Sequence, residues 1–85
     1  TEIYTLSLHD ALPIYLPDEG FVNLSIYNMM GQKVRTLRSE TMQPGYHSMV
    51  WDGRNDVGSQ VATGMYFYSI HTGSFQATKK MLFLK

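Results

Sequence analysis

Residues 51–70 read W-D-G-R-N-D-V-G-S-Q-V-A-T-G-M-Y-F-Y-S-I and join two strand-like runs through a loop crowded with Asp, Asn and Gly. The run after the loop, Met65–Ile70, is almost wholly aromatic or aliphatic, and such residues fit a pleated, half-buried surface. Gly and Asn readily adopt the positive φ that tight turns need. This stretch therefore predicts an antiparallel β domain.

Alternating apolar and polar residues on both sides of this stretch extend the β pattern. The clearest case is Phe21–Asn28, and further strands are expected at Ile14–Leu16, Val34–Leu37, Tyr46–Trp51 and Phe75–Leu84. Between them, Arg38–Gly45 is predicted to be a polar loop that ends in a Pro-Gly turn. The predicted core consists of Val22, Leu24, Ile26, Trp51 and one face of Met65–Ile70. The whole pattern favours an all-β sandwich of about six to seven strands.

Length and composition exclude several classes of protein. The chain has 85 residues, of which 44% are hydrophobic, so we expect one domain with one core. Seven basic residues balance seven acidic ones, which argues against nucleic acid or an anionic lipid surface as a partner. There is no cysteine, and no apolar run is long enough for a membrane-spanning helix, so we expect no membrane insertion. The chain begins with Thr and shows no signal peptide, so we expect a piece of a longer polypeptide with a domain upstream.

The first thirteen residues, T-E-I-Y-T-L-S-L-H-D-A-L-P, fit the pattern poorly. Two interpretations remain open: a first strand, or a translated sequencing adapter that is foreign to the natural protein. We therefore treat residues 1–13 as an unreliable N-terminal segment that contributes little to stability. The domain proper is expected to span residues 14–85.

The residues that could carry chemistry have simpler structural explanations. Asp52, Asn55 and Asp56 offer oxygen ligands for calcium, but the spacing is not that of an EF-hand, and Asx-type turns explain them more simply. Trp51 and the aromatic run Tyr66–Tyr68 could form a platform that stacks on a sugar. Aromatic residues also fill the cores of small β domains, and a core role is the simpler explanation.

Neither catalysis nor metal binding finds support in the remaining motifs. His9, His47 and His71 are scattered without metal-ligand spacing. The chain has neither a nucleophile elbow nor a phosphate-binding loop. We expect no catalytic residue, no cofactor and no obligatory metal, and hence no enzyme.

Several sequence blocks occur in an order that resembles a known family. They are Leu16-Pro17, Tyr27-Asn28 with Gly31-Gln32, Pro44-Gly45, Trp51-Asp52-Gly53, Gly64 with Tyr66 and Tyr68, and Lys80-Met81-Leu82. In this order the chain resembles the C-terminal Ig-like sorting domain of bacterial exported proteins (type A, type IX secretion). That family is close to the Ig-like domain of flagellar hook-capping proteins, the FlgD-like Ig domain. The resemblance covers Tyr15–Lys85, whereas the N-P-F-N-P-like opening of the family is replaced here by S-L-H-D-A-L-P.

The resemblance implies an Ig-like antiparallel β-sandwich and a non-catalytic targeting module. Such a module directs a larger bacterial protein through a secretion system to the cell surface or the medium. The secretion machinery would recognise the terminal strand, and the expected contact residues are Lys79, Lys80, Met81, Leu82, Phe83, Leu84 and Lys85. Pairing along an exposed strand edge is the expected mode. The alternatives are a structural Ig-like spacer or assembly module of the hook-capping type, and a carbohydrate-binding accessory module.

Overall fold

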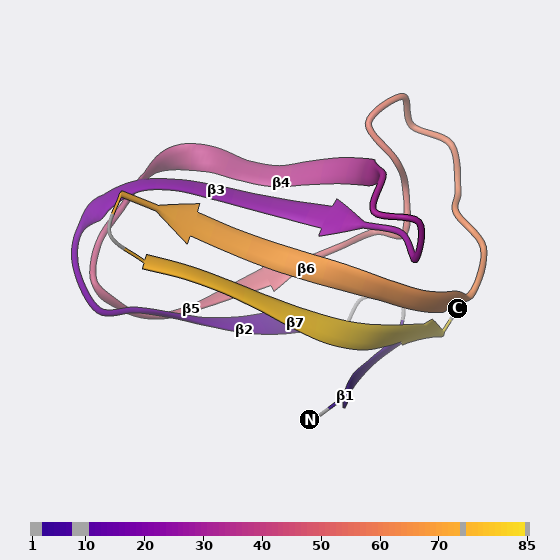
Figure 1. Ribbon diagram of the computed structural model, residues 1–85, viewed down its shortest axis with the longest axis horizontal. Coiled ribbons are helices and arrows are strands. Elements are labelled where there is room, and N and C mark those ends of the chain that lie inside the picture. Colours follow the sequence, from indigo (N-terminus) through magenta and orange to yellow (C-terminus); the bar gives the residue numbers. More distant parts are fainter. Residues whose placement is uncertain (1–2, 8–10, 74, 85) are drawn as a thin grey trace.

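A computed structural model describes residues 3–7, 11–73 and 75–84, with side-chain environments for residues 11–73 and 75–84. The described chain consists of strands joined by turns (Figure 1). The strands are β1 (Ile3–Ser7), β2 (Ala11–Leu16), β3 (Gly20–Tyr27), β4 (Lys33–Met42), β5 (Gly45–Val50), β6 (Gly64–Thr72) and β7 (Phe75–Leu84). Among these residues there is no helix of the length and apolar character that a membrane crossing requires.

Two sheets form an Ig-like β-sandwich, which confirms the predicted fold class. The larger sheet has the order β1-β7-β6-β3-β4, and the smaller one pairs β2 with β5. Neighbouring strands are antiparallel, except that β1 runs parallel to β7. The sheet is therefore mixed at the β1 side, where the sequence predicted only antiparallel pairing.

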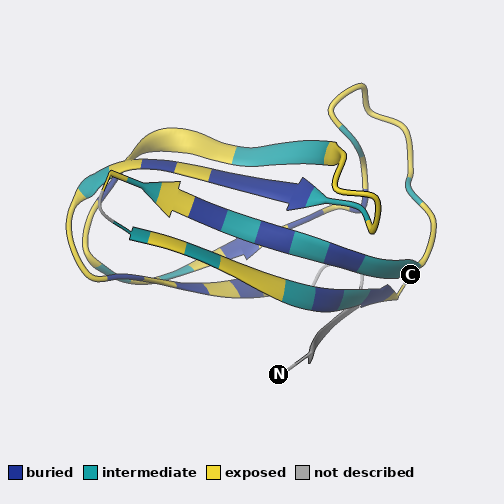
Figure 2. Ribbon diagram, viewed as in Figure 1, coloured by how far each residue is buried: buried dark blue, intermediate teal, exposed yellow. Residues whose placement is uncertain are grey.

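The core lies between the two sheets and is formed by the buried residues that alternate with more exposed ones along the strands (Figure 2). The predicted core residues Val22, Leu24, Ile26 and Trp51 are all buried, as are Tyr66, Tyr68 and Ile70 on one face of β6. Ser25 is buried as well, although the pattern placed it on the solvent face of β3. The reason is its central position, because Thr36 of β4 and Ser69 of β6 flank this small side chain on either side.

Strand β2 begins at Ala11, three residues before the predicted start. Its inner face carries Leu12, Ile14 and Leu16, all buried. The strand ends at Leu16, the predicted end, because Pro17 has no N–H group for the ladder. Residues 11–13, the end of the N-terminal segment that was considered unreliable, thus belong to β2. Residues 1–2 and 8–10, including His9, lie outside the described residues. The boundary at residue 14 stays a prediction.

Strand β4 is longer than predicted, and the prediction of a polar loop from residue 38 is wrong. Pairing with β3 continues to Met42, with two irregularities that leave Val34 and Leu37 without a direct partner across the ladder. At a bulge two residues oppose one, so the alternation of faces is reset. Val34 and Leu37 both pack against the core as a result.

Candidate functional site: the terminal strand and the loop end

The predicted contact residues of the terminal strand divide between the core and the surface. Met81 and Phe83 are fully buried, Lys79 and Leu84 are exposed, and Lys80 and Leu82 are half-buried. The Lys80 Nζ atom lies 5.9 Å from the ring centroid of Phe67 on β6, in a cation–π arrangement. Lys85 lies outside the described residues. The structure therefore leaves only part of the predicted segment accessible to a partner.

The backbone of the terminal strand is already paired on both sides, which corrects the expected mode of recognition. Strand β6 pairs with residues Phe75–Phe83 of β7, and β1 pairs with residues Lys80–Leu84 from the other side. A partner strand at Lys80–Leu84 would have to displace β1. Lys79 and the residues before it lie beyond the stretch that β1 covers.

The loop after Trp51 is held by Asx-type turns, as predicted. The Oδ1 atom of Asn55 accepts hydrogen bonds from the N–H groups of Val57 at 3.2 Å and Ser59 at 2.9 Å. Asp52 Oδ1 accepts from the N–H of Arg54 at 3.1 Å and forms an ion pair with Arg35 at 3.1 Å.

Asp56 fastens this loop to the outer edge of β4. Its N–H donates to the carbonyl of Val34 at 3.0 Å, and its Oδ1 accepts from the N–H of Thr36 at 3.0 Å. Both loop carboxylates thus have structural partners. The described residues contain no group of three acidic, His or Cys side chains that could hold a metal ion.

A second turn of the same construction lies nearby, at the predicted hairpin connection Asn28–Gln32, and only its likeness to the first turn was not expected from the sequence. In Asn28–Gln32 and in Asn55–Ser59, the Asn N–H donates to the carbonyl four residues on, and the Gly N–H donates back to the Asn carbonyl. Asn28 Oδ1 also accepts from the N–H groups of Met30 and Gln32, as Asn55 Oδ1 does in its own turn. The spacing Asn-x-x-Gly, present in both N-M-M-G-Q and N-D-V-G-S, was the signal that could have revealed the pair.

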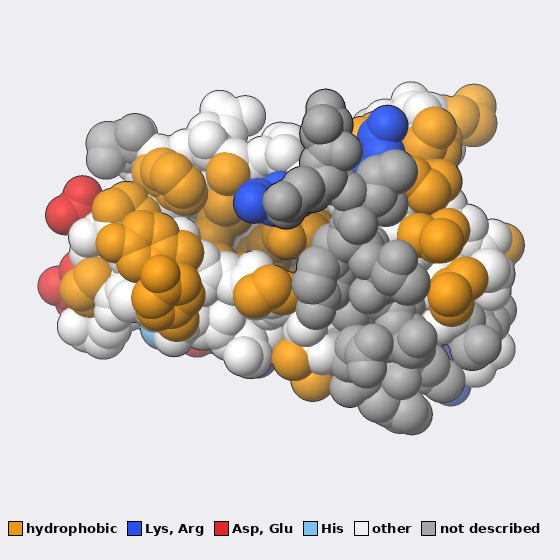
Figure 3. Space-filling view, turned by 90° about the horizontal axis from the view of Figure 1, so that it is seen from below, with side chains coloured by type: hydrophobic (Ala, Val, Ile, Leu, Met, Phe, Trp, Pro, Cys, Tyr) orange, Lys and Arg blue, Asp and Glu red, His pale blue; other side chains and the backbone are white. Residues whose placement is uncertain are grey.

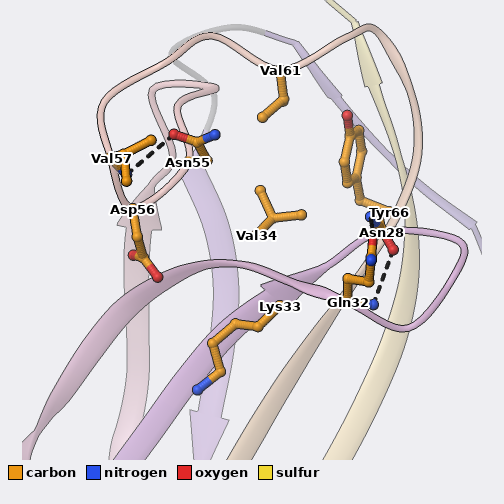
Figure 4. A pocket seen from close by; sticks show the side chains of 9 residues that line it. All are labelled: Asn28, Gln32, Lys33, Val34, Asn55, Asp56, Val57, Val61 and Tyr66. Atoms are coloured by element: carbon orange, nitrogen blue, oxygen red, sulfur yellow. Dashed lines mark hydrogen bonds between the residues drawn. The ribbon is translucent and has the colours of Figure 1, made fainter.

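An open groove of about 500 Å³ lies between the two turns (Figure 4). Val34 and Val61 point into it from opposite sides, while the ammonium group of Lys33 points away. Its amide side chains are already engaged, since Asn28 Nδ2 donates to Gln32 Oε1 at 2.9 Å. The groove therefore offers a small apolar floor, with hydrogen-bonded Asn28, Gln32 and Asn55 side chains on its rim.

One wall of the groove is Tyr66, which connects it to the aromatic core. The Tyr66 hydroxyl donates to the carbonyl of Ala62 at 2.7 Å, and burial raises the pKa of its phenol above the usual value. Its ring meets that of Trp51 edge-on, with centroids 5.4 Å apart, and Trp51 also packs on Phe83 at 4.6 Å. The Trp51 Nε1 donates to the carbonyl of Arg54 at 3.0 Å.

The predicted alternative of a sugar-stacking platform at these aromatic residues is wrong. Trp51, Tyr66 and Tyr68 are buried in the core, and Phe67 is half-buried with Lys80 over its ring, so the four residues present no common face to a sugar ring. The exposed aromatic pair is a different one, on the outer face of the small sheet. There the ring centroids of Tyr15 and Tyr46 lie 4.9 Å apart across β2 and β5.

Comparison with known proteins agrees with this architecture. The structure of FlgD from P. aeruginosa is similar, with a TM-score of 0.69 and 23% sequence identity over 85% of this chain and 55% of that one. The chain thus spans about half the length of that structure, and the likeness establishes the fold. No curated protein matches the chain. A family model described as the FlgD Ig-like domain matches residues 14–74, which is more than half of the sequence. The chain therefore belongs to the FlgD Ig-like domain family.

Proposed function

We propose that this chain is a structural Ig-like module of the hook-capping type, which contributes a rigid domain to a larger bacterial assembly. The observation that carries the proposal is the family match over residues 14–74. Domains of this family are structural and non-catalytic, in keeping with the expectation that the chain is not an enzyme. Family membership favours this reading over a targeting module.

The construction of the loop end supports a rigid role. Two Asn-x-x-Gly turns, the Arg35–Asp52 ion pair and the attachment of Asp56 to β4 hold the longest loop against the sandwich. Buried side-chain polar atoms all have hydrogen-bond partners among the described residues. Such a domain can serve as a rigid spacer, because its loops cannot move without breaking hydrogen bonds or the ion pair.

A domain exchange tests the proposal. The region of FlgD from P. aeruginosa that matches this chain is replaced by residues 11–85, and swimming motility is scored in a strain that lacks its own FlgD. We expect the chimera to restore more motility than a matched chimera with an unrelated Ig-like domain of similar length. If both chimeras accumulate equally but neither restores swimming, the hook-capping assignment fails.

The terminal segment favours export targeting as a second candidate. The family match ends at residue 74, before β7, so K-K-M-L-F-L-K at residues 79–85 lies outside it. This run is what resembles the end of a sorting domain, and Lys79 is exposed for recognition. Under this reading the secretion machinery is the partner, and the destination is the cell surface or the medium.

A reporter fusion separates the two candidates. A reporter with a signal peptide is fused to residues 11–85 in a host with the type IX machinery, and the periplasm, surface and medium are assayed. The informative variant is Lys79→Ser with Lys80→Ser, because deletion of the segment would also remove the core residues Met81 and Phe83. If the unaltered fusion stays in the periplasm, the targeting reading fails and the structural reading is unaffected.

A further inference from the structure

The strand edges of this sandwich are protected to very different degrees. Unpaired edges are templates for another strand, and proteins commonly block them with charges, prolines or bulges. The β4 edge has the two irregularities at Val34 and Leu37, and Asp56 occupies its backbone groups beside Thr36. The outer edge of β2 contains Pro13, which lacks an N–H group to offer.

Strand β5 has none of these protections. The segment Gly45–Val50 reads G-Y-H-S-M-V, with no Asp, Glu, Lys, Arg or Pro, and it pairs with β2 in unbroken register. In the described part of the chain, β2 is its sole sheet neighbour. The other side of β5 is therefore a bare edge, along which Tyr46 and Val50 have high β propensity.

The backbone groups at this edge can be identified from Pro13. In an antiparallel ladder, an opposed pair exchanges either two hydrogen bonds or none. Pro13 is opposite Ser48 and has no N–H to donate, so this pair cannot exchange two bonds. The N–H and C=O of Ser48 consequently point away from β2, as do those of Tyr46 and Val50, two residues to either side.

Above this edge, the larger sheet extends beyond the smaller one. Two residues link β4 to β5, and Figure 1 shows β5 on the side of the small sheet that is nearer β4, with β2 on the side nearer β1. Arg38 and Glu40 of β4 are opposite Leu24 and Val22 of β3, so they lie on the inner face of the sheet. Both are nevertheless exposed, which shows that the second layer does not cover this part of β4.

The space beside β5 thus has two distinct walls. On the inner side are the charged Arg38 and Glu40, two residues apart on β4. On the outer side are the exposed side chains of Tyr46 (85%) and Val50 (56%). Figure 3 shows the side of the molecule where β2 and β5 lie, with hydrophobic side chains gathered in clusters on it.

We propose that the β5 edge is a docking site for one extended segment of another polypeptide, which adds a third strand to the small sheet. The segment would alternate, with apolar side chains level with Tyr46 and Val50. Its other face would carry an acidic and a basic side chain, two residues apart, that meet Arg38 and Glu40. Backbone hydrogen bonds to Tyr46, Ser48 and Val50 supply the affinity, and the alternate side chains supply the specificity.

The geometry favours a single strand over a second copy of the chain. Strands in a sheet are about 4.8 Å apart, so a neighbour of β5 lies one strand spacing further toward the β4 side of the molecule. A second copy docked through its own β5 would bring its own β4 into the layer that this β4 already fills. Every strand-forming segment among the described residues is also already paired, so the added strand comes from outside them.

Two capped peptides of opposite charge order, V-E-V-K-V and V-K-V-E-V, test the proposal by amide NMR titration of the whole chain. We expect shifts centred on Tyr46, Ser48 and Val50 and on the adjacent Arg38–Glu40 stretch, with dissociation constants on the order of 0.1–1 mM. One order should bind about threefold to tenfold more tightly, because two exposed charge pairs are matched in one order and opposed in the other. The double variant Arg38→Glu with Glu40→Arg should invert that preference.

A backbone variant provides an independent arm. Ser48→Pro removes the central N–H of the edge without removing a bond to β2, so binding should be lost, whereas Ser48→Thr should bind as the unaltered chain does. Circular dichroism verifies that each variant is folded. The proposal is overturned if neither peptide shifts these amides at about 1 mM, or if the charge reversal leaves the preference unchanged. Self-association of the chain through the same amides would also overturn it, since a second copy would then be the occupant.

Discussion

Trp51 joins the core to the long loop that follows it. Its ring fills the space between Tyr66 and Phe83, and its Nε1 fixes the carbonyl of Arg54 in the loop. Trp51→Ala should lower the free energy of unfolding by about 3–5 kcal/mol, because it opens a large cavity. Urea midpoints measure the change, with Val57→Ala as a control at an exposed loop position, where the change should stay within about 0.5 kcal/mol. Equal midpoints for the Trp51 variant and the unaltered chain would contradict the assignment of Trp51 to the core.

Substitution of Gly58 measures how much the backbone conformation of an Asn-x-x-Gly turn contributes to stability. Its φ is +89°, in the left-handed region, and an added Cβ atom would meet nothing within 4 Å. Gly58→Ala should therefore cost about 1–2 kcal/mol from backbone strain alone. Gly58→Asn should cost less, because Asn tolerates this conformation. Gly73→Ala is the matched control, since Gly73 also has open space but no positive φ, and a similar loss there would show that strain is not the cause.

At the scale of elements, the sequence predicts strands best where one face is clearly buried. Val22, Leu24 and Ile26 alternate in β3, a central strand with regular neighbours, and all three were placed correctly. Strand β4 was cut short because it lies at an edge, where polar residues remain exposed on both faces, and because its irregularities reset the alternation. The turn at Asn55 was predicted from local chemistry, whereas the groove needed the spatial meeting of two turns. Pairing of β1 with β7 was out of reach, since alternation does not specify the partner of a strand.

Two truncations separate the contribution of β1 from that of Leu12. A chain that begins at Ala11 loses the pairing of β1 at one side of β7, so we expect its melting temperature to fall slightly. A chain that begins at Ile14 also loses Leu12, which is fully buried. Its free energy of unfolding should fall by a further ~2–5 kcal/mol. Thermal melts of the three chains make the comparison. A large drop on removal of residues 1–10 alone would make β1 an integral strand of the domain.

At the scale of the whole molecule, the 85-residue chain is expected to unfold as one cooperative unit, so the ionisation of one buried group affects its total stability. Burial raises the pKa of Tyr66 above its unfolded value near 10. A group whose pKa is raised by folding contributes stability that is fully present below the unfolded pKa and is lost as the pH rises through the folded pKa. The free energy of unfolding should therefore fall as the pH rises above about 10. In Tyr66→Phe, which keeps the ring between Trp51 and the groove but has no phenol to ionise, this alkaline loss should be smaller. Urea titrations of both chains at a series of pH values measure the difference, and parallel pH profiles would show that Tyr66 is not the group responsible.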